Sequence, residues 1–152
     1  FAASTQRRLL GGVTQAVPEH HDLCLWGVTP DGHGGYTQAM RTDAVNVMNY
    51  GVELGRRTWA ALMHELQWQT AGVDRIICHQ VGSAHQSAIL KTLGIPDDRD
   101  FTTFEYLGNM GTVSLPLTMA VAEERDMLEP GHKVGLLGIG SGLNCLMLGV
   151  NW

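Results

Sequence analysis

Two polar residues of this sequence stand where a strand or loop should lead into a helix. His79 follows the apolar, β-branched run 73–78, and Asn109 lies between glycines in Gly108-Asn109-Met110-Gly111. A histidine and an asparagine can both donate a hydrogen bond to one oxygen on which negative charge develops. In a carbon–carbon condensation, such charge builds on the thioester oxygen of the substrate whose α-carbon acts as the nucleophile. The pair therefore predicts condensation chemistry.

An acyl-transferring condensation also needs an activated cysteine. The three cysteines, Cys24, Cys78 and Cys145, are widely spaced and lie in apolar surroundings. This pattern is typical of reduced packing residues in a cytoplasmic protein and not of a disulfide framework. A dyad of Cys78 with His79 is not expected, because neighbouring strand residues point to opposite faces. Since the first residue is Phe1 and not methionine, we expect the chain to be part of a longer polypeptide.

Two other patterns do not predict a ligand site. The turn Gly138-Ile139-Gly140-Ser141-Gly142 has the glycine spacing of a dinucleotide fingerprint, but an apolar strand pattern follows it. No helix N-terminus would then face a phosphate, so we exclude a nucleotide site. His20, His21 and His33 match no standard zinc spacing, and we expect no metal.

Composition limits the class of protein. The 152 residues are 44% hydrophobic and 16% charged, which suits one globular domain with a core. The net charge of −5 and the 10 basic residues exclude a nucleic-acid binder. No apolar stretch approaches the ~18 residues of a membrane span.

Hydrophobic periodicity and turn residues predict alternating strands and helices. Strands are expected over 8–17, 73–78, 101–104, 133–139 and 143–150. Helices are expected from an N-cap at Thr42-Asp43 to Leu66, over 83–93 with Gly94 as a stop, and over 113–127 with Pro116 in the first turn. The segment Pro18 to Tyr36 is rich in Gly, Pro, Asp and His, and is interpreted as a loop-rich excursion.

This order predicts an α/β fold with a mixed, mostly parallel five-stranded sheet covered by helices. The last two strands, joined by a short turn, should be antiparallel and form an edge. Reactive groups in such sheets gather at the carboxyl ends of strands. His79 and Asn109 both fall there.

Three motifs together resemble one known family. His79-Gln80-Val81, Gly108-Asn109-Met110-Gly111 and the segment 138–145 are similar to the C-terminal half of the ketoacyl synthase III branch of the thiolase-like superfamily. The resemblance runs from Arg8 to Trp152 and is poorest over 18–36. Within that branch the last motif is most similar to that of OleA-type enzymes, which condense two fatty acyl-CoAs head to head.

The resemblance implies residue roles. The family's catalytic histidine and asparagine fall on His79 and Asn109, and its glycine-rich turn beside the acyl-cysteine falls on Gly140, Ser141 and Gly142. The nucleophilic cysteine would lie in an N-terminal half outside this chain, and the enzyme would be a cytoplasmic homodimer. Its substrate would be a coenzyme A thioester, and no cofactor is implied.

The sequence departs from the ketoacyl synthase III pattern at two positions. Gly82 replaces an asparagine, and Ala84 replaces the arginine with which the family docks acyl carrier protein. The departures favour acyl-CoA over acyl carrier protein as the donor. The expected reaction is a Claisen condensation of two acyl-CoAs to a β-ketoacyl product.

Three points stay open. The first alternative is a decarboxylative 3-oxoacyl-carrier-protein synthase III of fatty-acid or polyketide initiation, and the second is a non-catalytic dimerisation or scaffold half-domain. Glu105 is the carboxylate nearest Asn109 in sequence, but we interpret it as a solvated residue. The base that removes an α-proton should therefore come from the missing half or from a partner subunit.

Overall fold

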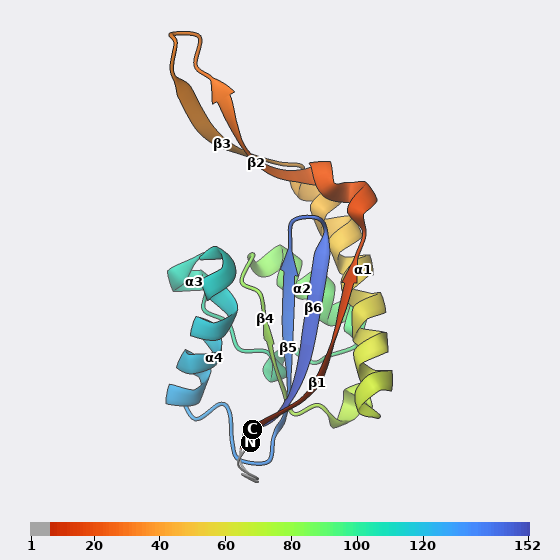
Figure 1. Ribbon diagram of the computed structural model, residues 1–152. Helices are drawn as coiled ribbons and strands as arrows, with labels where there is room; N and C mark the ends of the chain where they lie inside the picture. Colours follow the sequence, from red (N-terminus) through yellow and green to blue (C-terminus); the bar gives the residue numbers. More distant parts are fainter. Residues whose placement is uncertain (1–6) are drawn as a thin grey trace.

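The computed structural model describes residues 7–152 and is built around one mixed sheet. Its strands are β1 (Arg8–Ala16), β4 (Arg75–Cys78), β5 (Lys133–Gly140) and β6 (Asn144–Asn151), in the order β1-β6-β5-β4. β4 and β5 are parallel, whereas β6 is antiparallel to both β5 and β1. Helices cover both faces, as Figure 1 shows. The expected α/β class is confirmed.

One face is covered by α1 (Ala44–Leu66) and α2 (Ser83–Leu93). α1 begins at Asp43, whose Oδ1 accepts a hydrogen bond from Asn46 N at 3.1 Å, and α2 ends at Gly94 with φ of 67°. Both ends were predicted, because caps and glycine stops are local signals. The core on this face includes the buried residues Leu54, Leu62, Ile76, Leu90 and Met147.

The opposite face is covered by α4 (Ser114–Glu124), which packs on β4 and β5 and carries Pro116 in its first turn as predicted. A second core lies there, formed by Ile77, Ala122, Leu128, Val134, Leu136 and Trp152. The remaining helical segments are short: η1 (Pro18–Leu23), η2 (Thr70–Gly72), η3 (Asp97–Arg99), α3 (Phe104–Leu107) and η4 (Gly111–Val113). Within residues 7–152, no helix has the length and apolar character that a membrane crossing requires.

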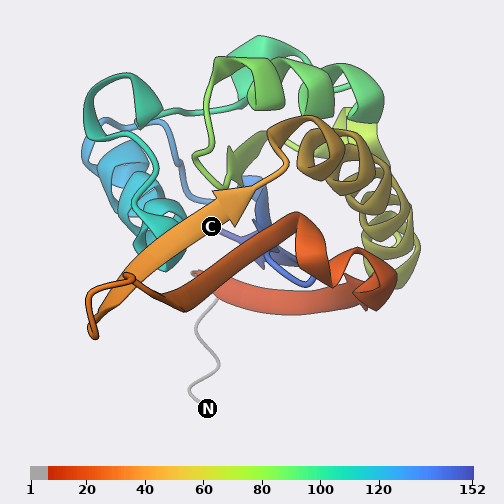
Figure 2. The same cartoon turned by 90° about the horizontal axis from the view of Figure 1, so that it is seen from above.

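A two-stranded arm projects from the sheet (Figures 1 and 2). It consists of β2 (Cys24–Pro30) and β3 (Tyr36–Thr42), paired antiparallel so that Trp26 faces Met40. The expected loop-rich excursion is therefore wrong over 24–30, which forms a strand, and correct over 31–35, which forms the turn. The density of Gly, Pro and Asp reflected the hairpin turn, in which Asp31 Oδ1 accepts from His33 N and Gly35 N, and obscured the strands beside it.

The expected five-stranded, mostly parallel sheet is also wrong. The sheet has four strands with one parallel pair, and β1 rather than β6 forms its antiparallel edge. The fifth strand, expected over 101–104, is reduced to a single parallel bridge between Ile76 and Asp100. Its amides are used elsewhere: Thr103 N and Phe104 N donate to Gln80 Oε1, and Phe104 begins α3.

Candidate active site

The three predicted site segments lie at one edge of the sheet. β4 and β5 run in parallel, and His79 N extends their ladder by donating to Leu137 O at 2.8 Å. The carboxyl end of β4 and the turn after β5 therefore share an edge. The bridge between Ile76 and Asp100 is also parallel, so the chain after Asp100 runs toward that edge and reaches Asn109 through α3 (Figure 1).

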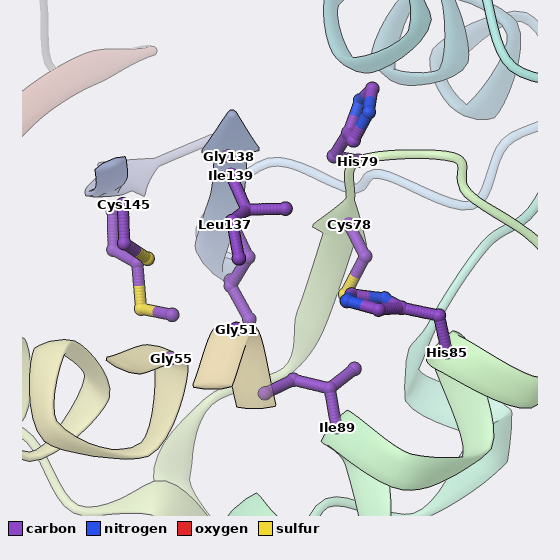
Figure 3. A pocket seen from close by; sticks show the side chains of 11 residues that line it. Gly51, Gly55, Cys78, His79, His85, Ile89, Leu137, Gly138, Ile139 and Cys145 are labelled. Atoms are coloured by element: carbon purple, nitrogen blue, oxygen red, sulfur yellow. The ribbon is translucent and has the colours of Figure 1, made fainter. Parts of the chain in front are cut away.

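His79 is half-buried at this edge. Burial lowers the pKa of its imidazole below the ordinary 6.5, so the ring is neutral at neutral pH. A neutral imidazole carries one N–H donor and one acceptor nitrogen. In Figure 3 the ring of His79 points away from Cys78 and His85.

Asn109 lies in an exposed loop whose shape is fixed by hydrogen bonds. Its Oδ1 accepts from Gly111 N at 2.9 Å, an Asx-turn. Met110 N donates to Ser114 Oγ at 2.8 Å, and Ser114 is buried at the start of α4. Because the amide oxygen of Asn109 is engaged, its Nδ2 is the group presented as a donor.

Both predicted donors thus come to one edge of the sheet. Their convergence on a single substrate oxygen, at ~3 Å from each, stays a prediction.

The glycine-rich turn joins β5 to β6. Gly140 ends β5, and Asn144 Nδ2 closes the turn by donating to Ser141 O at 2.7 Å. Gly142 has φ of 131°, and a Cβ there would collide with the Asn144 side chain. The turn therefore needs a glycine at Gly142. The predicted roles of Gly140, Ser141 and Gly142 beside an acyl-cysteine stay predictions.

An apolar pocket lies next to this edge, between the sheet and helices α1 and α2 (Figure 3). Its lining includes two glycines of α1, Gly51 and Gly55, which are four residues apart. A Cβ at Gly51 would lie 2.9 Å from Ile139 Cδ1, and one at Gly55 would lie 2.8 Å from Ile89 Cδ1. Glycine in a helix interior costs about 1 kcal/mol relative to alanine. Their spacing was a signal in the sequence that we did not interpret.

His85, which the sequence analysis did not single out, also borders this pocket. Burial lowers the pKa of its imidazole, and a positive charge on a protonated His79 would lower it further. Its ring lies beside the Cys78 side chain in Figure 3. Its position in the first turn of the helix that follows His79 was the available signal.

Neither Cys78 nor Cys145 is set up as a nucleophile. Burial and the neighbouring carboxyl group of Asp100 raise the pKa of the Cys78 thiol well above its usual value. Burial also raises the pKa of Cys145. Cys78 and His79 both border the pocket, but they form no dyad, as expected from their neighbouring positions. Their side chains point apart, and a protonated thiol is a poor nucleophile.

Asp100 is a buried carboxyl group with one unpartnered oxygen. Gln86 Nε2 donates to its Oδ2 at 2.8 Å, whereas Oδ1 has no hydrogen-bond partner within the described part of the chain. Burial raises the pKa of Asp100 to about 6. The proton on this group is therefore lost near neutral pH, which leaves a buried and poorly compensated charge.

This charge predicts a pH-dependent loss of stability. The folded protein holds the Asp100 proton more tightly than the unfolded chain, so stability falls as pH rises from 3.8 to about 6 and stays lower above that range. Replacing Asp100 by asparagine should therefore raise the stability above pH 6, by up to about 3 kcal/mol. The check is thermal unfolding of the protein from pH 5 to 8.

The exposed Asp98→Asn is the matched control and should leave the pH dependence unchanged. An Asp100→Asn protein that melts below the wild type at pH 8 would show that the carboxylate has a partner outside this chain.

Comparison with known proteins gives a consistent assignment. An acyl-CoA:acyl-CoA alkyltransferase of Shewanella oneidensis is 48% identical over 97% of this chain and 42% of its own. The structure of Xanthomonas campestris OleA with bound lauric acid and lauroyl-CoA superposes with a TM-score of 0.83 at 34% identity, over 96% of this chain and 41% of that one.

A 3-oxoacyl-(acyl carrier protein) synthase III, FabH, from Xanthomonas oryzae superposes with a TM-score of 0.84 at 33% identity, over 99% of this chain and 42% of that one. The chain thus spans about two fifths of the length of the curated relatives it matches, 42% and 40% for the first two. Residues 63–152 match the model of the 3-oxoacyl-[acyl-carrier-protein] synthase III C-terminal family. The chain belongs to this family.

Proposed function

We propose that this chain is the C-terminal catalytic half of an acyltransferase that condenses two acyl-CoA molecules to a β-ketoacyl product. The observation that carries the proposal is the placement of a neutral His79 and an oriented Asn109 amide at one edge of the sheet. The relative from Shewanella oneidensis is named for an acyl-CoA:acyl-CoA reaction, and the Xanthomonas campestris OleA structure holds lauroyl-CoA. Both support acyl-CoA as the substrate class.

The proposed reaction has two stages. An acyl group first moves from coenzyme A to a cysteine outside this chain, and the coenzyme A thiol is released. A second acyl thioester then loses an α-proton, and its α-carbon attacks the acyl-cysteine carbonyl, so that the bond to sulfur breaks and the new carbon–carbon bond forms. His79 and Asn109 Nδ2 donate to the thioester oxygen as enolate charge builds. Such donors are worth about 3 kcal/mol each.

The base and the cysteine are assigned to other parts of the protein. Glu105 is exposed and accepts a hydrogen bond from Thr102 Oγ1 at 2.9 Å, so it is not set up to remove a proton from carbon. We assign the cysteine to an N-terminal half, and the base to that half or to a partner subunit of a homodimer.

The arm supports this assignment. A two-stranded hairpin is marginal alone in water, yet β2 and β3 expose Trp26, Val28, Tyr36 and Met40. A further part of the protein that covers these side chains would explain why the arm carries exposed apolar residues.

The donor of the second acyl group distinguishes the two catalytic alternatives. Ala84 is exposed in the first turn of α2 and offers no positive charge to a carrier protein, which favours coenzyme A. The similarity to β-ketoacyl-carrier-protein synthases III keeps the decarboxylative reaction as the second candidate.

The test is to supply the full-length protein with a saturated acyl-CoA alone and to follow the products by mass spectrometry. A β-ketoacyl product and free coenzyme A are expected. Product that forms only after malonyl-carrier protein is added would replace the proposal with the decarboxylative reaction. No product with either donor would favour the non-catalytic dimerisation or scaffold half-domain.

A further inference from the structure

Gln80, the residue directly after His79, is almost completely buried, with 1% of its surface exposed. Glutamine is seldom buried to this degree, and a buried amide needs partners for its oxygen and its nitrogen. Gln80 has both. Neither the proposed role of His79 nor the packing of the core explains why a polar side chain is kept at this position.

The side chain of Gln80 joins two segments that are far apart in the sequence. Its Nε2 donates to Cys78 O at 2.7 Å, at the last residue of β4. Its Oε1 accepts from Thr103 N at 2.8 Å and from Phe104 N at 3.1 Å. The nitrogen of this amide thus fixes the end of β4, next to His79. Its oxygen holds the start of the segment that leads to Asn109.

The two amides held by Gln80 start α3. The first amides of a helix have no partner within the helix, so an acceptor there fixes where the helix begins. α3 is only four residues long, and Gly108 alone separates it from Asn109. The same start is tied to α4, because Thr103 Oγ1 lies 2.6 Å from Thr118 Oγ1 and both residues are fully buried.

We propose that Gln80 is a positioning residue that sets the distance between His79 and the Asn109 loop. The proposal rests on the proposed function, in which these two side chains donate to one oxygen. A shift of about 1 Å in such a pair can cost about 100-fold in rate. Methionine fills a similar volume but leaves Thr103 N, Phe104 N and Cys78 O without their partner. Protonated glutamate keeps an acceptor for the two amides and a donor to Cys78 O, whereas ionised glutamate keeps the acceptor but buries a negative charge against that carbonyl oxygen.

The experiment compares Gln80→Met and Gln80→Glu in the full-length protein. Acylation of the enzyme is followed by intact mass and condensation by product formation. Gln80→Met should lower kcat for condensation by about 10- to 100-fold and leave the rate of acylation within about twofold. Gln80→Glu should fall between the wild type and Gln80→Met, and it guards against misfolding of the methionine variant.

Gln86→Met is the matched control, because Gln86 loses a part-buried side-chain hydrogen bond, to Asp100, but has none to Cys78 O or to the amides that start α3. It should lower the melting temperature and leave the ratio of condensation to acylation unchanged. Equal loss of acylation and condensation in Gln80→Met, in step with its melting temperature, would overturn the positioning role.

A crystal structure of Gln80→Met separates this inference from the proposed function. A displacement of the Asn109 loop relative to His79 is expected whether or not the wild type condenses acyl-CoA. An unchanged geometry overturns the positioning role, whereas a wild type that forms no product overturns the proposed function instead.

Discussion

Replacing His79 or Asn109 by alanine in the full-length protein should lower the condensation rate by about 10²- to 10³-fold. Each side chain is expected to donate to the thioester oxygen only while enolate charge builds, so its removal acts on the transition state. The half-buried, neutral His79 is an N–H donor at neutral pH, and the Asn109 amide is held by Gly111 N so that Nδ2 is presented. Product formation from acyl-CoA measures the loss.

The first stage provides an internal control for both variants. Acyl-cysteine should still form, because the attack of the cysteine on the first thioester does not pass through the enolate that His79 and Asn109 stabilise. Exposed residues of α1 give matched controls, and His64→Ala and Asn49→Ala should behave as the wild type. If the two donors share one oxygen, the double variant should lose less than the product of the two single losses. Loss of acylation together with condensation would argue for a structural role.

How far the sequence predicted the fold depended on whether a signal was local. The helix ends at Asp43 and Gly94 were predicted correctly, because capping involves residues within one turn. The missing fifth strand was not predictable in this way. Its amides donate to Gln80, more than 20 residues earlier in the chain, and no local pattern shows that contact.

The residues of the candidate site also divide into those with a local signal in the sequence and those without one. His79 and Asn109 could be chosen because polar residues at strand ends and between glycines are visible in one sequence. The role of Gln80 depends on tertiary hydrogen bonds, and the raised pKa of Asp100 depends on burial; neither follows from residue type. The glycines Gly51 and Gly55 were different, because their spacing in a helix already indicated close approach of another segment.

The 152-residue chain by itself should show no condensing activity with acyl-CoA and should form no acyl-enzyme. A thiolate is the attacking species. Burial raises the pKa values of Cys78 and Cys145, and this disfavours the thiolate form. Cys24 lies in the arm, with its Sγ 3.6 Å from Thr42 Oγ1, and not at the edge that carries His79. None of the three cysteines is therefore placed to accept the acyl group.

The measurement is release of coenzyme A together with the intact mass of the chain after incubation with acyl-CoA. Circular dichroism must first show that the isolated chain has folded, because an unfolded chain would be inactive for an unrelated reason. The full-length protein is the positive control and should gain the mass of one acyl group. An acyl adduct on Cys78 or Cys145 of the folded chain would place the nucleophile in this half, and the apolar pocket that both residues border would then be the site of acylation.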